Sequence, residues 1–171
     1  MLARALTIVV VAGGVVLAGC TCDVCAPDDS SGCPEVEWPP RNGDKVTITQ
    51  GISGDVWFWE GDFMPPCPTG TVTAIARELR IHELTGIDEV EPAGYSTFYT
   101  AVHTELVATA WSDTTGFFEV ELEPGWYSLF AVESTFYYAS LFGGGGLIWP
   151  VEVVEGEVSE RLFDINYLMS W

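Results

Sequence analysis

The stretch SDTTGFFEVELEPGWYSLF, residues 112–130, decides the fold because apolar side chains recur in it at every second position. Before Pro124-Gly125 the apolar residues alternate with glutamates, and after it they alternate again in a run rich in aromatic residues. Successive side chains of a strand point to opposite faces of a sheet, and Pro-Gly favours a tight turn. We therefore predict a hairpin whose inward residues are Phe118, Val120, Leu122, Tyr127 and Leu129.

The same period of two continues over most of the chain from residue 45 onward, where no segment has the pattern of an amphipathic helix. Short alternating runs are separated by turn residues, which is typical of an antiparallel sandwich. Val56 and Phe58 extend the predicted core. The sequence predicts an all-β fold, a seven- to eight-stranded antiparallel Ig/prealbumin-like sandwich. The predicted strands lie in the runs 52–59, 71–81, 106–110, 118–123, 126–132, 148–154 and 158–167.

Two blocks of the sequence carry a family resemblance: GDVWFWEGDFMPP at 54–66 and the stretch at 112–130. Together they resemble the carboxypeptidase regulatory-like domain, a transthyretin-like β-sandwich, over roughly residues 46–167. The resemblance implies scaffold roles for the matching residues, and it implies neither a catalytic residue nor a fixed ligand. The matching positions are Gly54, Val56, Gly61, Pro65, Ser112, Asp113, Gly116, Phe118, Leu122, Gly125, Tyr127 and Leu129.

Three of these residues have a clear physical reason for their positions. Asp113 can accept hydrogen bonds from the N–H groups of its own turn. Gly116 allows the positive φ that such a turn needs. Tyr127 can bury its ring while its hydroxyl bonds a loop. We expect all three to be structural.

The N-terminus has the pattern of a bacterial lipoprotein signal. Arg4 precedes an apolar run of about 14 residues, which as a helix would rise only ~21 Å and could not cross the ~30 Å hydrocarbon core of a bilayer. The run ends in Leu17-Ala18-Gly19-Cys20, which resembles a lipobox, a motif whose cysteine is lipidated. We predict a signal peptide at 1–19, lipidation of Cys20, a tether at 20–44 and the sandwich at 45–171, in the cell envelope outside the cytoplasm and on the outer membrane if the cell is Gram-negative.

The formal net charge of −19 limits the classes of partner that we expect for this protein. Nucleic acids need a basic surface to displace their counterions, so we expect no nucleic-acid partner. The membrane partner is expected through the lipid anchor and not through attraction to anionic lipid. A protein or a neutral glycan is the expected class of further partner.

Four cysteines follow Cys20, namely Cys22, Cys25, Cys33 and Cys67, and an exported chain can keep them as disulfides. Four cysteines allow three pairings, of which Cys22–Cys25 with Cys33–Cys67 is preferred. The CxxC spacing also leaves open an accessory or minimal enzyme that uses thiol-redox chemistry, although the surrounding sequence lacks the βαβ context that lowers a thiol pKa.

The search for other chemistry yields no catalytic residue, no metal site and no cofactor. His82-Glu83 is not followed by the second histidine of an HExxH zinc motif. The acidic groups Asp28-Asp29 and Asp88-Glu89-Glu91 match no spaced calcium loop, and whether calcium binds stays open. The expected function is therefore a non-catalytic, lipid-anchored module with a binding or structural role.

Four aromatic residues occupy strand positions where the alternation calls for a polar residue. Either the segments 83–97 and 134–146 cover them, or they form an interaction patch. Aromatic rings bury a large area at little cost in entropy, so we name these four as the candidate binding residues. They are Trp57, Trp59, Trp126 and Phe130.

Overall fold

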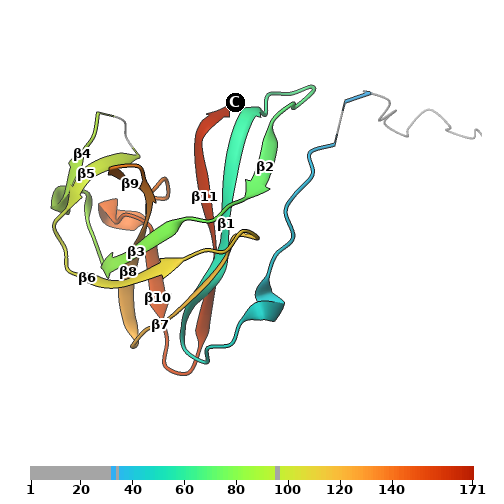
Figure 1. Ribbon diagram of the computed structural model, residues 1–171. Coiled ribbons are helices and arrows are strands. Elements are labelled where there is room, and N and C mark those ends of the chain that lie inside the picture. The colour runs from blue at the N-terminus through green and yellow to red at the C-terminus, as the bar shows by residue number, and fades with distance from the viewer. Residues whose placement is uncertain (1–31, 34, 95–96) are drawn as a thin grey trace, which may run out of the picture. The chain divides into compact units, whose positions relative to one another are not determined.

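The structure is a computed structural model that describes residues 32–171 except 34, 95 and 96. Within these residues the chain forms eleven strands and three short 3-10 helices (Figure 1). The strands are β1 (Gly51–Asp62), β2 (Thr71–Ala74), β3 (Glu78–Glu83), β4 (Val90–Pro92), β5 (Phe98–Val102), β6 (Leu106–Trp111), β7 (Phe117–Glu121), β8 (Gly125–Glu133), β9 (Phe136–Tyr138), β10 (Pro150–Val153) and β11 (Val158–Ser170). The 3-10 helices are η1 (Gly43–Lys45), η2 (Ile87–Glu89) and η3 (Gly144–Gly146).

The smaller sheet has four strands and is organised around β1. On one side of β1 lies β11, which runs parallel to it. On the other side β7 pairs with residues 51–55 and β2 pairs with residues 57–60, both antiparallel. Every other strand pairing in the described residues is antiparallel, so the β1–β11 pair is the one departure from the predicted antiparallel pattern.

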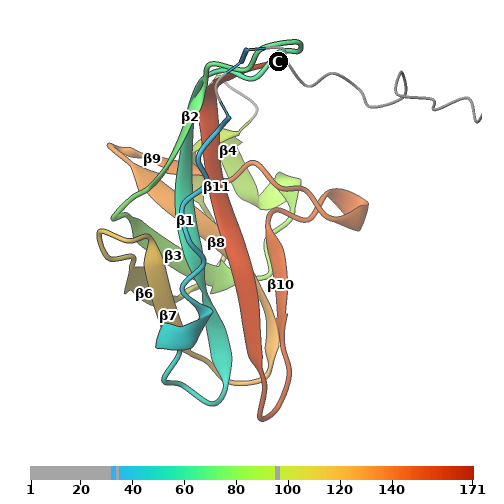
Figure 2. The ribbon, with the colours of Figure 1, turned by 90° about the vertical axis from the view of Figure 1, so that its right-hand side faces the viewer.

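The larger sheet has seven strands and is organised around β8. The order of its strands is β4-β5-β9-β8-β3-β6. β9 and β10 share one side of β8, because β10 pairs with residues 125–128 and β9 pairs with residues 131–133. β6 therefore forms one edge of this sheet, which Figure 2 shows on the outside of the molecule.

The main core lies between the two sheets. Val56 and Ile52 of β1 and Phe163 of β11 are fully buried against Ile81 of β3 and Leu129 of β8. Phe118, Leu122 and Tyr127 are buried as predicted, and Phe58 and Val120 pack against the core at its margin. The predicted all-β sandwich is confirmed, and the strands beyond the predicted seven or eight include the three-residue strands β4 and β9.

The stretch at 112–130 does not form the predicted hairpin. β7 pairs with β1 in the smaller sheet, whereas β8 belongs to the larger sheet, so Pro124-Gly125 carries the chain from one sheet to the other. Leu122 and Tyr127 face the core from its two sides, and the Tyr127 hydroxyl donates to the carbonyl of Glu123, 2.9 Å away. The hairpin prediction was wrong because alternation fixes the face of a strand but not the strand that it pairs with.

The turn that leads into β7 is built as the sequence predicts. The Asp113 carboxylate accepts hydrogen bonds from the N–H groups of Thr115 and Phe117, at 2.7 and 3.1 Å. Gly116 has a φ of +84°, and a Cβ there would lie 2.7 Å from the carbonyl oxygen of Val56. The turn therefore brings the chain against β1 so closely that a side chain at 116 would clash.

Candidate functional site

The four candidate aromatic residues do not form one surface. Trp57 and Trp59 lie on β1 in the smaller sheet, and Trp126 and Phe130 lie on β8 in the larger sheet. Trp57 is 7% exposed and Phe130 is fully buried, whereas Trp126 is 50% exposed. Trp126 is thus the one of the four that offers most of its ring to a partner.

Phe130 is buried under the folded edge of the larger sheet. Its ring meets Tyr99 of β5 and Tyr137 of β9 at centroid distances of 6.0 and 6.1 Å, and His82 of β3 at 5.6 Å. The segment 134–146, which includes β9, supplies part of this cover. For Phe130 the structure therefore agrees with the predicted alternative in which the chain covers the aromatic residue. The prediction that Phe130 could bind a partner at the surface is wrong, because β5 and β9 place aromatic rings over the outer face of β8.

Trp57 is buried by a segment that the sequence assigned to the tether. The indole of Trp38 lies 6.3 Å from Trp57 and 5.2 Å from Trp59, centroid to centroid. Val36 packs into the same small cluster, whose buried members are Trp57, Phe63 and Val72. Neither of the two predicted covering segments accounts for Trp57, since the cover comes from residues 36–38.

Covalent and polar contacts hold this N-terminal segment on the sheet. A disulfide joins Cys33 to Cys67, with the two Cα atoms 5.2 Å apart, as the preferred pairing predicts. The carboxylate of Asp55, which is 1% exposed, accepts hydrogen bonds from the guanidinium of Arg41 at 2.7 Å and from the side-chain amide of Asn42 at 2.6 Å. Residues 35–44 therefore pack as part of the sandwich unit.

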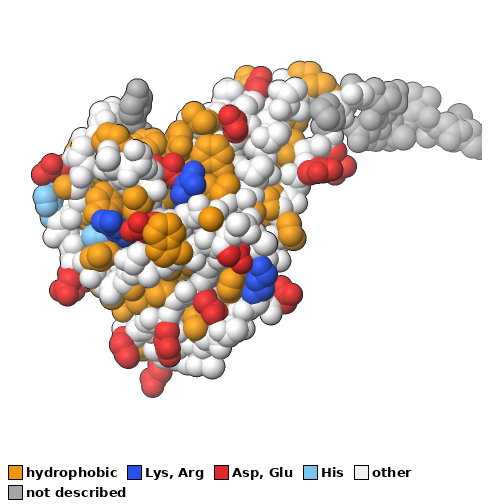
Figure 3. All heavy atoms as spheres, viewed as in Figure 1, with side chains coloured by type: hydrophobic (Ala, Val, Ile, Leu, Met, Phe, Trp, Pro, Cys, Tyr) orange, Lys and Arg blue, Asp and Glu red, His pale blue; other side chains and the backbone are white. Residues whose placement is uncertain are grey.

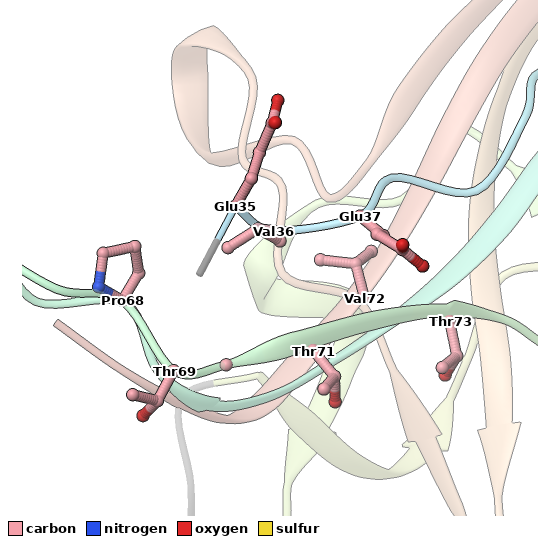
Figure 4. Close-up of a pocket in the computed structure, with 9 residues that line it drawn as sticks. Glu35, Val36, Glu37, Pro68, Thr69, Thr71, Val72 and Thr73 are labelled. Carbon is pink, nitrogen blue, oxygen red and sulfur yellow. The ribbon is translucent and has the colours of Figure 1, made fainter. Parts of the chain in front are cut away.

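A cleft of about 370 Å³ separates this segment from β2 and the residues before it (Figure 4). In Figure 4 Val72 points toward the side where Val36 and Glu37 lie, while Thr71 and Thr73 point to the opposite side. Glu35 points away from the strand. The lining combines apolar side chains, among them Val36 and Val72, with Glu35 and Glu37, and none of the predicted binding residues belongs to it, so we place no site there.

A second cleft, of about 490 Å³, surrounds Trp126. It lies where β3 ends and β6 begins, and two acidic residues, Glu83 and Glu105, are among those that line it. Neither carboxylate forms an ion pair with any of the residues that the structure describes. The cleft is lined by Glu83, Glu105, Leu106, Val107, Gly125, Trp126 and Tyr127.

The edge strand β6 continues this surface. Its sequence LVATAW contains no charged residue and no proline, the two features with which proteins usually protect a strand edge. Three of its large apolar side chains are exposed, namely Leu106 (45%), Val107 (42%) and Trp111 (66%), and Thr109 is exposed as well. Figure 3 shows hydrophobic side chains exposed among acidic ones on the face of the molecule turned to the viewer of Figure 1.

The hydrogen-bond alternation shows which groups of β6 face outward. Ser112 donates its N–H to the carbonyl of Arg77, and the register continues with Ala110 opposite Leu79. In an antiparallel pair every second residue bonds its partner, so Thr109 and Trp111 direct their N–H and C=O groups away from β3. No other strand of the described residues pairs with β6.

His82 is a packed residue and not a ligand at the surface. It is 3% exposed, its Nδ1 lies 3.0 Å from the carbonyl oxygen of Thr104, and its Nε2 has no partner among the described residues. Burial is the main cause that lowers the pKa of His82 below its ordinary value, and the nearby charge of Arg80 lowers it further. The ring is therefore neutral at pH 7.

The remaining predicted residues lie outside the described part of the chain. These are the lipidation candidate Cys20 and the CxxC pair Cys22 and Cys25, of which the structure describes nothing. In the part that it does describe, no group of three or more His, Cys, Asp or Glu could hold a metal ion. No helix among these residues is long and apolar enough to cross a membrane.

Sequence reasoning named Trp126 as a binding candidate but missed the open edge of β6 beside it. The run Leu106 to Trp111 carried a signal for it, because six residues without charge or proline are unusual for an edge strand. The absence of charge and proline indicates a binding edge only once the strand order shows that β6 lies at the edge of its sheet. Comparison with known proteins adds no relative: no protein family, no curated protein and no solved structure matches this chain.

Proposed function

We propose that this chain is a non-catalytic, lipid-anchored module that works outside the cytoplasm and binds an extended segment of a partner protein along β6. As part of the proposal we group it with the carboxypeptidase regulatory-like sandwiches, on the motifs at 54–66 and 112–130. The observation that carries the binding role is the open edge of β6 beside the exposed ring of Trp126.

An open strand edge suits a polypeptide better than any other ligand. The outward N–H and C=O groups of Thr109 and Trp111 match the spacing of another strand, which would add to the sheet through main-chain hydrogen bonds. The side chains of Thr109 and Trp111 lie on the outer face of the sheet, because Ala108 and Ala110 of the same strand face Ile81 and Leu79 in the core. A strand laid along β6 would therefore have Trp111 beside one part of its length and the Trp126 cleft beside another.

The charge around the cleft favours a basic side chain on that segment. Glu83 and Glu105 are carboxylates without an ionic partner in the described residues, and a lysine or arginine could pair with them while lying against the indole of Trp126. Arg80, the one cation on the neighbouring stretch of β3, is already paired with Glu78 at 2.9 Å. The net charge of −19 attracts a basic segment over longer distances as well.

The anchoring part of the proposal rests on Leu17-Ala18-Gly19-Cys20. Replacing Cys20 with serine should release the protein from the membrane fraction, because the acyl chains would have no attachment point. Mass spectrometry of the wild-type protein should show a lipid-modified N-terminal cysteine. Retention of Cys20→Ser in the membrane fraction would contradict the anchor.

The binding part can be tested with an array of short peptides that share a β-forming sequence and differ in one central residue, lysine or glutamate. We expect the wild type to prefer the lysine peptides. Trp126→Ala and Glu105→Gln should each weaken this binding by roughly tenfold, or about 1.4 kcal/mol. Because Trp126 is exposed and Glu105 is unpaired, the melting temperature of both variants should stay near that of the wild type.

Thr109→Pro separates strand addition from simple contact with the cleft. Proline removes an N–H that points away from β3, so it should abolish peptide binding while Thr109→Ala, the matched control, binds normally. A neutral-glycan array run in parallel covers the other class of partner. If glycans bind, and if Trp126→Ala but not Thr109→Pro removes that binding, the peptide proposal is wrong and the site is a sugar platform.

A further inference from the structure

One end of the smaller sheet exposes apolar side chains next to the place where the described chain begins. Phe63 donates its N–H to the carbonyl of Ser170 at 2.9 Å, and its ring lies 6.2 Å from that of Trp171. The loop after β1 and the last residues of β11 therefore lie together. We call residues 62–68 with residues 168–171 the tip.

The tip is apolar on both faces of the sheet. Leu168 and Met169 are consecutive in β11, so their side chains point to opposite faces. Met169 packs into the cluster around Trp57, whereas Leu168 is 50% exposed. Met64 in the loop is 46% exposed and Trp171 is 72% exposed. Large apolar side chains that gather at one exposed end mark an interaction site more often than scattered ones do.

The tip is also the end at which the anchored segment is attached. The disulfide between Cys33 and Cys67 ties the incoming chain to the tip itself. Figures 1 and 2 both show the C terminus, the loop between β1 and β2 and the first described residues at the same end of the sheet. Cys20 precedes Cys33 by 13 residues, which can span at most roughly 45 Å. A lipid on Cys20 would therefore hold Cys33 within roughly 45 Å of the bilayer, so that the tip is the end of the sheet that can reach the membrane first.

The side chains of the tip suit the headgroup region of a bilayer. Tryptophan is enriched at membrane–water interfaces, where its ring is apolar and its N–H can be hydrated. The side chains of the tip include no lysine or arginine, and their one acidic member, Asp62, accepts a hydrogen bond from the N–H of Met64 at 2.8 Å. Such a surface has no attraction for anionic lipid, so zwitterionic headgroups are the better match.

We infer that the tip rests in the zwitterionic headgroup region of the membrane that holds Cys20. The inference depends on the proposed lipid anchor and is separate from the proposed binding of a protein segment along β6. The sandwich is then held at two places, by the acyl chains and by Trp171, Leu168 and Met64. A second copy of the chain is the competing occupant of the tip.

The test uses the full chain purified from membranes and reconstituted into vesicles of phosphatidylcholine and phosphatidylethanolamine. A fraction of the lipid carries a nitroxide near the top of its acyl chain, which quenches tryptophan only at short range. The wild type is compared with Trp171→Phe, which stays apolar but loses the reporter. Trp111→Phe is the matched control, because Trp111 is similarly exposed but lies on β6.

The expected result is that nitroxide lipid quenches the wild type and that Trp171→Phe loses most of this quenching, whereas Trp111→Phe keeps it. Equal quenching in the wild type and Trp171→Phe, with the protein still floating with the vesicles, would overturn the tip contact and leave the anchor intact. Failure to float would overturn the anchor and the tip contact together. Crosslinking of the reconstituted protein into dimers that Trp171→Ser abolishes would assign the tip to a second copy instead.

Discussion

Replacing Cys33 and Cys67 together with serine should destabilise the sandwich mainly through its unfolded state. The disulfide joins residues 34 positions apart. Closing a loop of that length lowers the entropy of the unfolded chain by roughly 13 cal/mol/K, which corresponds to about 4 kcal/mol at 25 °C. This value lies within the range of about 2–5 kcal/mol that removal of a native disulfide typically costs in small secreted domains.

The native state of this double variant should change little. Arg41 and Asn42 still bond the buried carboxylate of Asp55, and Trp38 still lies against Trp57 and Trp59. The emission spectrum of the folded variant should therefore match that of the wild type. A red-shifted spectrum before any denaturant is added would mean that the disulfide alone holds the segment on the sheet.

Urea unfolding followed by tryptophan fluorescence measures the loss, with Cys22→Ser/Cys25→Ser as the control. A Cys22–Cys25 bridge would close a very short loop, so its removal should cost far less than removal of the bridge between Cys33 and Cys67. A loss below about 1 kcal/mol for Cys33→Ser/Cys67→Ser would refute the reasoning, because a loop of this length cannot be opened so cheaply in the chain-entropy account.

Two further predictions concern the core and the buried histidine. Phe118→Ala should lower the free energy of unfolding by about 3–5 kcal/mol, because the ring is 1% exposed and its loss leaves a cavity; a cost near zero in urea unfolding would contradict the core assignment. Burial lowers the pKa of His82 in the folded state below its ordinary value of about 6.5. Below that pH the unfolded chain binds a proton at His82 more readily than the folded chain does, so protonation favours unfolding. Stability should therefore fall with pH from that point toward the folded-state pKa, and His82→Gln should flatten the dependence in melting experiments; an unchanged slope would show that other groups cause it.

The parts of the fold that local alternation determines could be predicted from the sequence. Phe118, Leu122, Tyr127 and Leu129 are inward because burial of one strand face requires apolar residues at every second position. The turn at Asp113 could also be predicted, because its hydrogen bonds are local.

The parts that depend on contacts between distant residues could not be predicted. The alternation around Pro124-Gly125 is the same whether the two strands pair or enter different sheets. The preferred cysteine pairing did predict the disulfide between Cys33 and Cys67. The burial of Trp57 also depends on Trp38 packing against it and on Arg41 reaching Asp55, and a segment without any period gives no sign of these two contacts. The open edge at Thr109 follows from the strand order alone, which no single strand encodes.

The central claim is that a partner segment adds to β6, and amide hydrogen exchange tests it most directly. In the free protein the N–H groups of Thr109 and Trp111 should exchange quickly because they point away from β3, whereas those of Ala108 and Ala110 should be protected. With a saturating lysine-containing peptide, the account predicts new protection at Thr109 and Trp111 and no change at Ala108 and Ala110. Peptide binding that leaves the exchange of Thr109 and Trp111 unchanged would contradict strand addition.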